Sequence, residues 1–190
     1  GTSGLRHVGG CGMTLSEFNL DNVTQEIENW VLNYLDVPSD HYNGHKACPF
    51  AKKTLDKNEH RIEVTWEHPS KWYQKFAKDS KRIYIIAYKP DVIGLGDAVD
   101  ELNHEWADKD VWGVAFEPSD EEPDDETLDP DEWGSIVDEA YPMLLIQSLS
   151  ETEELSLSLD KKGYYKKCSP EFMDYVQSRK DLQNGRTRKR

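Results

Sequence analysis

The segment Ile83-Tyr-Ile-Ile-Ala-Tyr88 constrains the fold more than any other part of this 190-residue chain. All six of its residues are apolar or aromatic, and strands favour β-branched and aromatic side chains. A strand with one face in water alternates apolar and polar residues, whereas this segment shows no such alternation. We therefore expect a central strand that is covered on both of its faces.

Strands and helices are predicted in alternation around this segment. Ile62, Val64 and Trp66 alternate with polar residues, which is typical of a half-buried strand. Further elements are expected as strands at 111–116 and 141–149, and as helices at 23–35, at 95–106, from Ser70, from about Thr152 and from Pro170 after its cap Ser169. This order predicts an α+β fold, a single two-layer domain with an about four-stranded mixed sheet and helices packed on it.

The composition suits one folded domain between two polar ends. The chain is 36% hydrophobic, which is enough for a single buried core at this length. Residues 1–12 are interpreted as a cloning remnant or a disordered leader, 13–182 as the α+β domain, and 183–190 as a disordered basic tail. No apolar run approaches the roughly 18 residues of a membrane span, so no membrane partner is expected.

Negative charge is concentrated in one stretch of the chain. The formal net charge is −14, and ten of the sixteen residues from 117 to 132 are Asp or Glu, with no Lys or Arg among them. Such a charge disfavours binding to a nucleic-acid backbone or to an anionic membrane, because both require positive patches. Nucleic-acid contact is expected only through the basic tail, at Arg186, Arg188, Lys189 and Arg190.

The acidic loop at 117–132 predicts a surface for protein binding. A dense array of carboxylates imitates a nucleic-acid backbone and fits the basic groove of a partner protein, while nearby aromatic residues supply anchors. The residues expected to bind are Asp120, Glu121, Glu122, Asp124, Asp125, Glu126, Trp112, Trp133 and Tyr141. The leading hypothesis is therefore a non-catalytic interaction module that binds a basic surface. A solvated loop, a Ca²⁺-binding loop and adaptation to a salty habitat are the alternatives.

The segment from His41 to Lys53 combines a thiol, two imidazoles and turn residues, and it predicts a different function. Pro49 suits the first position of a helix, which would place Cys48 at the N-cap beside unpaired backbone N–H groups. The helix dipole would then lower the pKa of the thiol and make it a better nucleophile. Cys48 with His45 or His41 would form the site of a thiol-transfer or redox enzyme. A buried packing role for Cys48 is the structural alternative.

The same segment offers a partial ligand set for a metal. His41, His45 and Cys48 follow spacings of four and three, and Cys168 would be the fourth ligand of a zinc site. However, Asn43-Gly44 favours a turn between the histidines, and no Cys-x-x-Cys pair is present, so no metal or cofactor is predicted. The three cysteines of the chain form no disulfide framework, which indicates a reducing, cytoplasmic location.

Short motifs along the chain resemble those of an uncharacterised bacterial family that carries a Leu-Cys-Pro-Phe-Ala motif after an N-terminal helix. The matching segments are Trp30-Val31, Cys48-Pro49-Phe50-Ala51-Lys52, Tyr88-Lys89-Pro90, Phe116-Glu117-Pro118 and Tyr141-Pro142-Met143-Leu144-Leu145. The resemblance covers about residues 25–180 and implies a fold rather than an activity. Where the family has arginines, this chain has Asp138-Glu139-Ala140 and Gln147-Ser148. Any binding of an anionic ligand by those arginines is therefore not expected here.

Overall fold

The computed structural model describes residues 18–117 and 141–188. These residues form a four-stranded sheet of β1 (His60–Thr65), β2 (Ile83–Tyr88), β3 (Val111–Phe116) and β4 (Met143–Ser148), in the order β1-β2-β4-β3. β1 runs parallel to β2, and β4 runs antiparallel to both β2 and β3. The predicted α+β fold with a four-stranded mixed sheet is confirmed.

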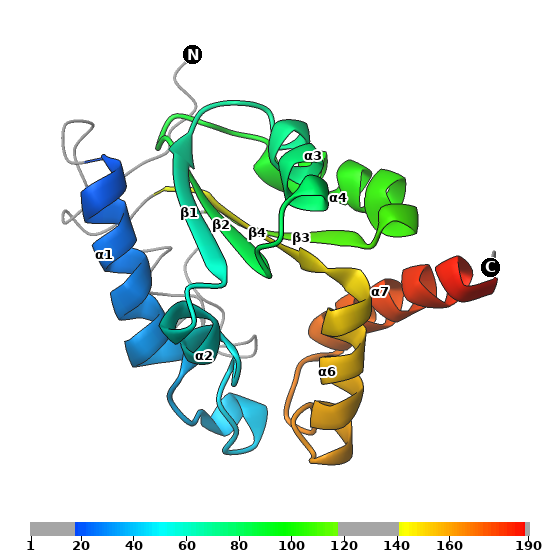
Figure 1. The fold of residues 1–190 in the computed structure, drawn as a ribbon. Helices are drawn as coiled ribbons and strands as arrows, with labels where there is room; N and C mark the ends of the chain where they lie inside the picture. Colours follow the sequence, from blue (N-terminus) through cyan, green and yellow to red (C-terminus); the bar gives the residue numbers. More distant parts are fainter. Residues whose placement is uncertain (1–17, 118–140, 189–190) are drawn as a thin grey trace.

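Helices cover both faces of the sheet (Figure 1). The described α-helices are α1 (Leu20–Trp30), α2 (Ala51–Asp56), α3 (Ser70–Lys78), α4 (Leu95–Trp106), α6 (Leu149–Lys161) and α7 (Pro170–Arg188). α3 and α4 pack on one face, whereas α1, α2 and α7 lie on the other. The sheet is thus the middle layer of the described structure, although the sequence predicts two layers.

The alternation of side chains along β2 explains why both faces are covered. Tyr84 and Ile86 point to the face of α3 and α4, whereas Ile85 and Ala87 point to the face of α1. All four residues are at most 3% exposed, as expected for a central strand. β4 is central as well, because it inserts between β2 and β3 although it follows both in the sequence.

The face of α3 and α4 is closely packed around one glycine. The Tyr73 hydroxyl of α3 donates a 2.8 Å hydrogen bond to Asn103 of α4. The Asn103 amide in turn binds the backbone N–H and C=O of Gly113 at 2.7 and 2.8 Å, so it occupies the outer edge of β3. A Cβ atom at Gly113 would lie 1.9 Å from the Tyr73 hydroxyl, so only glycine fits at this position.

The face of α1 is less regular. Val23 and Ile27 pack against the sheet, and beyond Trp30 the helix widens into a π-helical turn, Val31–Leu35. Such turns are frequently found at functional sites. Here the turn lines a cavity.

The C-terminal helix corrects one prediction. α7 begins after Ser169, as expected, but it continues to Arg188 through residues that the sequence predicts to be a disordered tail. Arg186 forms a 3.0 Å ion pair with Asp110, and its side chain is only 10% exposed. This ion pair ties the end of α7 to the start of β3. Arg186 is therefore engaged within the chain and is not available for the predicted contact with nucleic acid.

Candidate functional site

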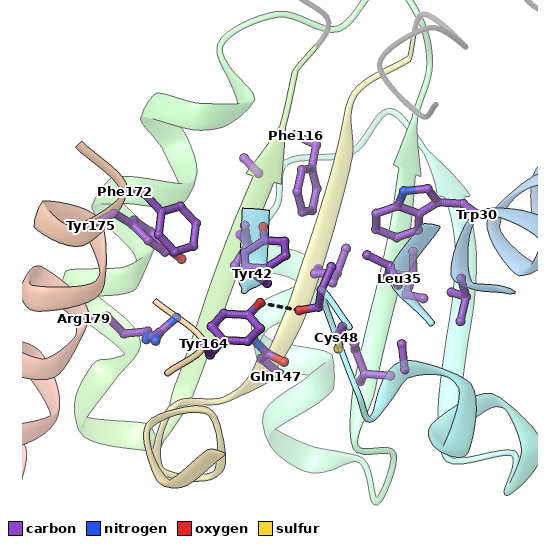
Figure 2. A pocket seen from close by; sticks show the side chains of 18 of the residues that line it. Trp30, Leu35, Tyr42, Cys48, Phe116, Gln147, Tyr164, Phe172, Tyr175 and Arg179 are labelled. Carbon is purple, nitrogen blue, oxygen red and sulfur yellow. Dashed lines mark hydrogen bonds between the residues drawn. The ribbon is translucent and has the colours of Figure 1, made fainter. Parts of the chain in front are cut away.

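A cavity of about 600 Å³ opens on the α1 side of the sheet. Most of the strand residues that line it are two positions apart on three strands, so one face of the sheet supplies these side chains, and Ala115 between two of them also borders the cavity. The alternating residues, which form the floor, are Ile83 and Ile85 of β2, Leu145 and Gln147 of β4, and Val114 and Phe116 of β3. Figure 2 shows the cavity from close by.

Two segments that are far apart in the sequence form the walls of the cavity. One wall comes from the end of α1 and the loop after it, with Trp30, Leu35, Tyr42 and Cys48 among its residues. The opposite wall comes from the start of α7 and the turn before it, with Tyr164, Tyr165, Phe172, Tyr175 and Arg179 (Figure 2). The lining is therefore mainly aromatic and aliphatic, with a few polar groups.

The loop at 39–48 is fixed against the turn that follows α6. Three hydrogen bonds join the two segments: Asn43 Nδ2 to the Gly163 carbonyl at 3.1 Å, His45 Nε2 to the Lys162 carbonyl at 3.0 Å, and the Tyr164 hydroxyl to the Ala47 carbonyl at 2.5 Å. The rings of Tyr42 and Tyr164 also stack, with their centroids 4.6 Å apart. The loop that the sequence predicts as a reaction site thus serves to join the two walls of the cavity.

Cys48 lines the cavity, but its surroundings do not activate the thiol. α2 begins at Ala51 with Phe50 as its N-cap, so Cys48 lies before the helix rather than at its cap. Burial raises the pKa of the Cys48 thiol, and this effect outweighs the opposing effect of the backbone N–H groups of Phe50 and Ala51. The pKa shift is opposite to the predicted one, because the thiol lies in an apolar wall.

Neither imidazole of the predicted enzyme site is paired with the Cys48 thiol among the described residues. His45 donates from Nε2 to a backbone carbonyl of the turn after α6. His41 lies in the short 3₁₀ helix Asp40–Tyr42. Neither imidazole is among the groups that shift the pKa of the Cys48 thiol. The structure brings the three residues into one loop, but within the described residues it does not pair Cys48 with a general base.

A buried ion pair forms a polar end of the cavity. Arg179 donates from Nε to the carboxylate of Glu153, and the two side chains are 9% and 7% exposed. Trp112 donates a 3.1 Å hydrogen bond to the Tyr175 hydroxyl, and the Arg179 guanidinium lies 5.7 Å from the centre of the Tyr175 ring. Burial alone would lower the pKa of Arg179, but Tyr175 and Glu153 outweigh it and raise that pKa. Arg179 therefore stays charged and is neutralised by Glu153.

Gln147 is the polar residue on the cavity floor. It follows Met143 and Leu145 at alternate positions of β4, so its side chain leaves a central strand on an apolar face. With the residues of the two described ranges, its amide makes no hydrogen bond. A primary amide has both donor N–H groups and an acceptor carbonyl, and leaving them unpaired in apolar surroundings costs free energy. Water or a ligand in the cavity must therefore bind this amide.

The residues predicted to form an acidic interaction surface fall into two groups. Trp112 and Tyr141 are 3% and 1% exposed, so neither ring is available as an exposed anchor, contrary to the prediction. Both pack in the core, and the Tyr141 hydroxyl donates a 2.9 Å hydrogen bond to Glu26. The other predicted binding residues lie outside the described ranges: Asp120, Glu121, Glu122, Asp124, Asp125, Glu126 and Trp133.

Glu117 is the one residue of the acidic loop that the described ranges include. Its carboxylate accepts a 3.0 Å hydrogen bond from the backbone N–H of Gly96, in the first turn of α4. A carboxylate at this end of a helix satisfies an unpaired N–H group and interacts favourably with the helix dipole. The Glu117 carboxylate is therefore hydrogen-bonded to the start of α4, and Glu117 also borders the cavity.

Three further findings concern metal ligands, membrane-spanning helices and similarity to known proteins. Among residues 18–117 and 141–188, no three His, Cys, Asp or Glu side chains gather closely enough to hold a metal ion. No helix in these ranges combines the length and the apolar composition needed to cross a membrane. Comparison of the chain with protein-family models, curated proteins and solved structures gave no match. The resemblance to the bacterial family therefore stays a prediction.

Sequence reasoning missed the residues that give the cavity its character. For Gln147 a signal was present, because a polar residue ends the apolar alternation Met143, Leu145 in a predicted central strand. For Tyr164 and Arg179 no local signal exists. The place of Tyr164 depends on a hydrogen bond across 117 residues, and that of Arg179 on an ion pair with Glu153 across 26 residues.

Proposed function

We propose that this protein is a non-catalytic binding protein whose aromatic cavity holds an apolar small molecule. The observation that carries the proposal is the cavity itself, with its volume of about 600 Å³ and its aromatic lining. Small-molecule sites in proteins typically have volumes of roughly 300–1,000 Å³ and combine an apolar lining with a few convergent polar groups. The cavity described above meets both conditions.

Two polar groups favour binding over catalysis. The raised pKa of the Cys48 thiol leaves little thiolate at neutral pH, and the thiolate is the nucleophilic form. The Arg179 guanidinium is already paired with Glu153, so it is held as a fixed structural charge. Both groups can contact a ligand, but neither is prepared to attack it. The predicted cysteine-dependent enzyme is therefore the weaker of the two functions.

Titration with a neutral fluorophore tests the proposal. N-phenylnaphthylamine, which fluoresces in apolar surroundings, should bind the full chain with a saturable signal. Val114→Phe adds a ring on the cavity floor and should weaken binding at least about tenfold, because it takes up volume that the fluorophore needs. Leu32→Phe is the control, since Leu32 is exposed outside the cavity.

The outcomes of this titration are distinct. Saturable binding that Val114→Phe weakens and Leu32→Phe does not would support a ligand cavity. A signal that is absent, or equal in both variants, would reject it. Circular dichroism and urea unfolding of each variant establish that the fold is intact, so that lost binding reports on the cavity.

A second proposal concerns the acidic loop at 117–132. Its ten carboxylates, without a basic residue among them, favour binding to a basic surface of a partner protein. A pull-down with the full chain should recover a basic partner, and replacement of the Asp and Glu residues at 120–126 by Asn and Gln should abolish it. Unchanged recovery would reject the proposal. The cytoplasmic location stays a prediction as well.

A further inference from the structure

We infer that the ligand of the cavity is a neutral, planar ring system whose edge places a hydrogen-bond donor beside an acceptor, as in a lactam, and that Gln147 binds this edge. The inference rests on the proposed function, because it specifies what the same cavity takes up. It follows from three properties of the described lining: its charge, its aromatic walls and the amide of Gln147.

The charged residues that line the cavity favour a ligand without a net charge. Among the lining residues that the structure describes, Arg179 is the one cationic side chain, and it is buried against Glu153. A carboxylate ligand would have to compete with this buried pair, and breaking such a pair is costly. A cationic ligand would find Glu153 already paired and the Glu117 carboxylate hydrogen-bonded to Gly96.

The aromatic walls favour a planar ligand. Trp30 and Phe116 meet edge to face, with their ring centroids 6.0 Å apart, and Tyr42 stacks on Tyr164. Both pairs border the cavity but are themselves largely buried, and it is the partly exposed rings of Phe116, Phe172 and Tyr175 that a ligand can contact. Flat rings make stacked or edge-to-face contacts with such groups, which contribute beyond the area that they bury.

The amide of Gln147 favours a paired donor and acceptor. Its carbonyl and its NH₂ group lie side by side in one plane, so they bind an edge of complementary pattern through two parallel hydrogen bonds. Because Gln147 has no hydrogen bond to the residues of the two described ranges, these positions are open to a ligand. A ligand that fills both would replace water without leaving the amide unpaired.

A matched set of probes tests this inference. Phenanthridinone has three fused rings and a lactam edge, N-methylphenanthridinone has the same rings with the donor blocked, and phenanthrenecarboxylate has a negative charge. Each is measured by displacement of N-phenylnaphthylamine from the full chain. Phenanthridinone should bind roughly tenfold more tightly than its N-methyl derivative, since losing one hydrogen bond to the half-buried amide of Gln147 has about that effect.

Gln147→Met links the preference to the residue. Methionine has a similar volume and shape but no amide, so N-phenylnaphthylamine should bind to this variant within about threefold of its original affinity. Phenanthridinone and its N-methyl derivative should then bind equally. Gln147→Asn, which keeps the amide on a shorter side chain, supports the inference if it retains part of the preference.

The outcomes separate this inference from the proposed function. If N-phenylnaphthylamine binds but the unmodified chain does not prefer phenanthridinone, the inference fails and the cavity proposal stands. If Gln147→Met still prefers phenanthridinone over its N-methyl derivative, another group binds the lactam edge and the inference fails. Tightest binding of phenanthrenecarboxylate would assign ligand recognition to Arg179 instead. If N-phenylnaphthylamine does not bind at all, both proposals fail together.

Discussion

The two faces of the sheet differ although the same strands supply both. On the side of α3 and α4, the strand residues pack against the helices and have no exposed surface, as at Tyr84, Ile86, Leu144 and Ile146. On the side of α1, the alternate residues of the same strands include Leu145 and face a cavity of about 600 Å³. Successive residues of one strand therefore point alternately into a filled core on one face of the sheet and towards a cavity on the other.

This difference has a cause in the connections of the chain. α3 and α4 link successive strands and lie directly on the sheet beside each other. On the other face, α1 and α7 come from opposite ends of the described chain, and a docked loop joins them through the turn at Tyr164. A face closed by helices is packed for stability, whereas a face bounded by distant segments can hold space for a ligand.

The largest expected effect is on the closed face, at Gly113. Gly113→Ala places a Cβ against the Tyr73 hydroxyl and should lower the free energy of unfolding by at least about 3 kcal/mol, because a buried backbone and its hydrogen bonds must shift. The matched control is Gly185→Ala in α7, where a Cβ meets nothing and should stabilise the helix by about 0.5–1 kcal/mol. Urea unfolding measures both variants, and similar values would show that the closed face has room.

A pair of substitutions on β4 compares the two faces directly. Leu144→Ala should lower the free energy of unfolding by about 3 kcal/mol, because its side chain is fully buried and leaves a new cavity. Leu145→Ala should cost only about 1 kcal/mol, since that side chain is partly buried and borders existing space. Equal losses in chemical denaturation would mean that the cavity is absent in solution.

Alkaline pH should act through buried tyrosines on both faces of the sheet, because burial also raises the pKa of Tyr164 and of Tyr175 beside the cavity. Burial raises the pKa of Tyr84 to about 12 and raises that of Tyr88 further, while tyrosines of an unfolded chain ionise near pH 10. The folded state then holds protons that the unfolded state releases, so stability should be constant below about pH 9 and fall as the pH rises through 10 and above. Denaturation at a series of pH values measures this loss, and a flat profile would contradict it.

Tyr88→Phe sharpens the same test. Within the described residues the Tyr88 hydroxyl is buried without a hydrogen-bond partner, so its removal should stabilise the protein by up to about 1 kcal/mol at neutral pH. The variant should also lose less stability above pH 10, because one raised pKa is gone. Tyr34→Phe, at an exposed position, is the control and should leave neutral stability unchanged. A destabilised Tyr88→Phe would indicate a hydrogen-bond partner in solution.

The smallest effect is expected at Cys48 on the cavity side. Iodoacetamide at pH 6.5 should modify Cys48 more slowly than it modifies a model thiol, because the raised pKa leaves less thiolate. Bound N-phenylnaphthylamine should slow the reaction further, since Cys48 lines the cavity. Peptide mass mapping distinguishes Cys48 from Cys168. Faster modification than the model thiol would restore the cysteine-dependent enzyme as the better hypothesis.

The closed face could be predicted from the sequence better than the open one. The bounds of two strands, Ile83–Tyr88 and Val111–Phe116, agree with the prediction because uninterrupted apolar and aromatic residues specify them. The place of β4 between β2 and β3 could not be predicted in the same way. Strand order depends on which faces pack together in three dimensions, and a one-dimensional pattern does not contain that information.

The candidate site depended still more on tertiary structure. The sequence singled out the loop with His45 and Cys48, which does border the cavity, but for the wrong reason. His45 holds the loop to the turn after α6, and burial raises rather than lowers the pKa of Cys48. The role of His45 arises from a contact with a residue 117 positions away, which no local spacing could reveal, and the burial of Cys48 follows from its place in the hydrophobic cluster on the α1 side.

The difference between the faces can be measured directly by nuclear Overhauser effects between bound N-phenylnaphthylamine and the methyl groups of β3 and β4. The cavity predicts contacts from the fluorophore to Leu145 and Val114, and none to Leu144 and Ile146 on the opposite face. Contacts to both sets, or to exposed methyl groups alone such as those of Leu157, would contradict a cavity that binds ligands.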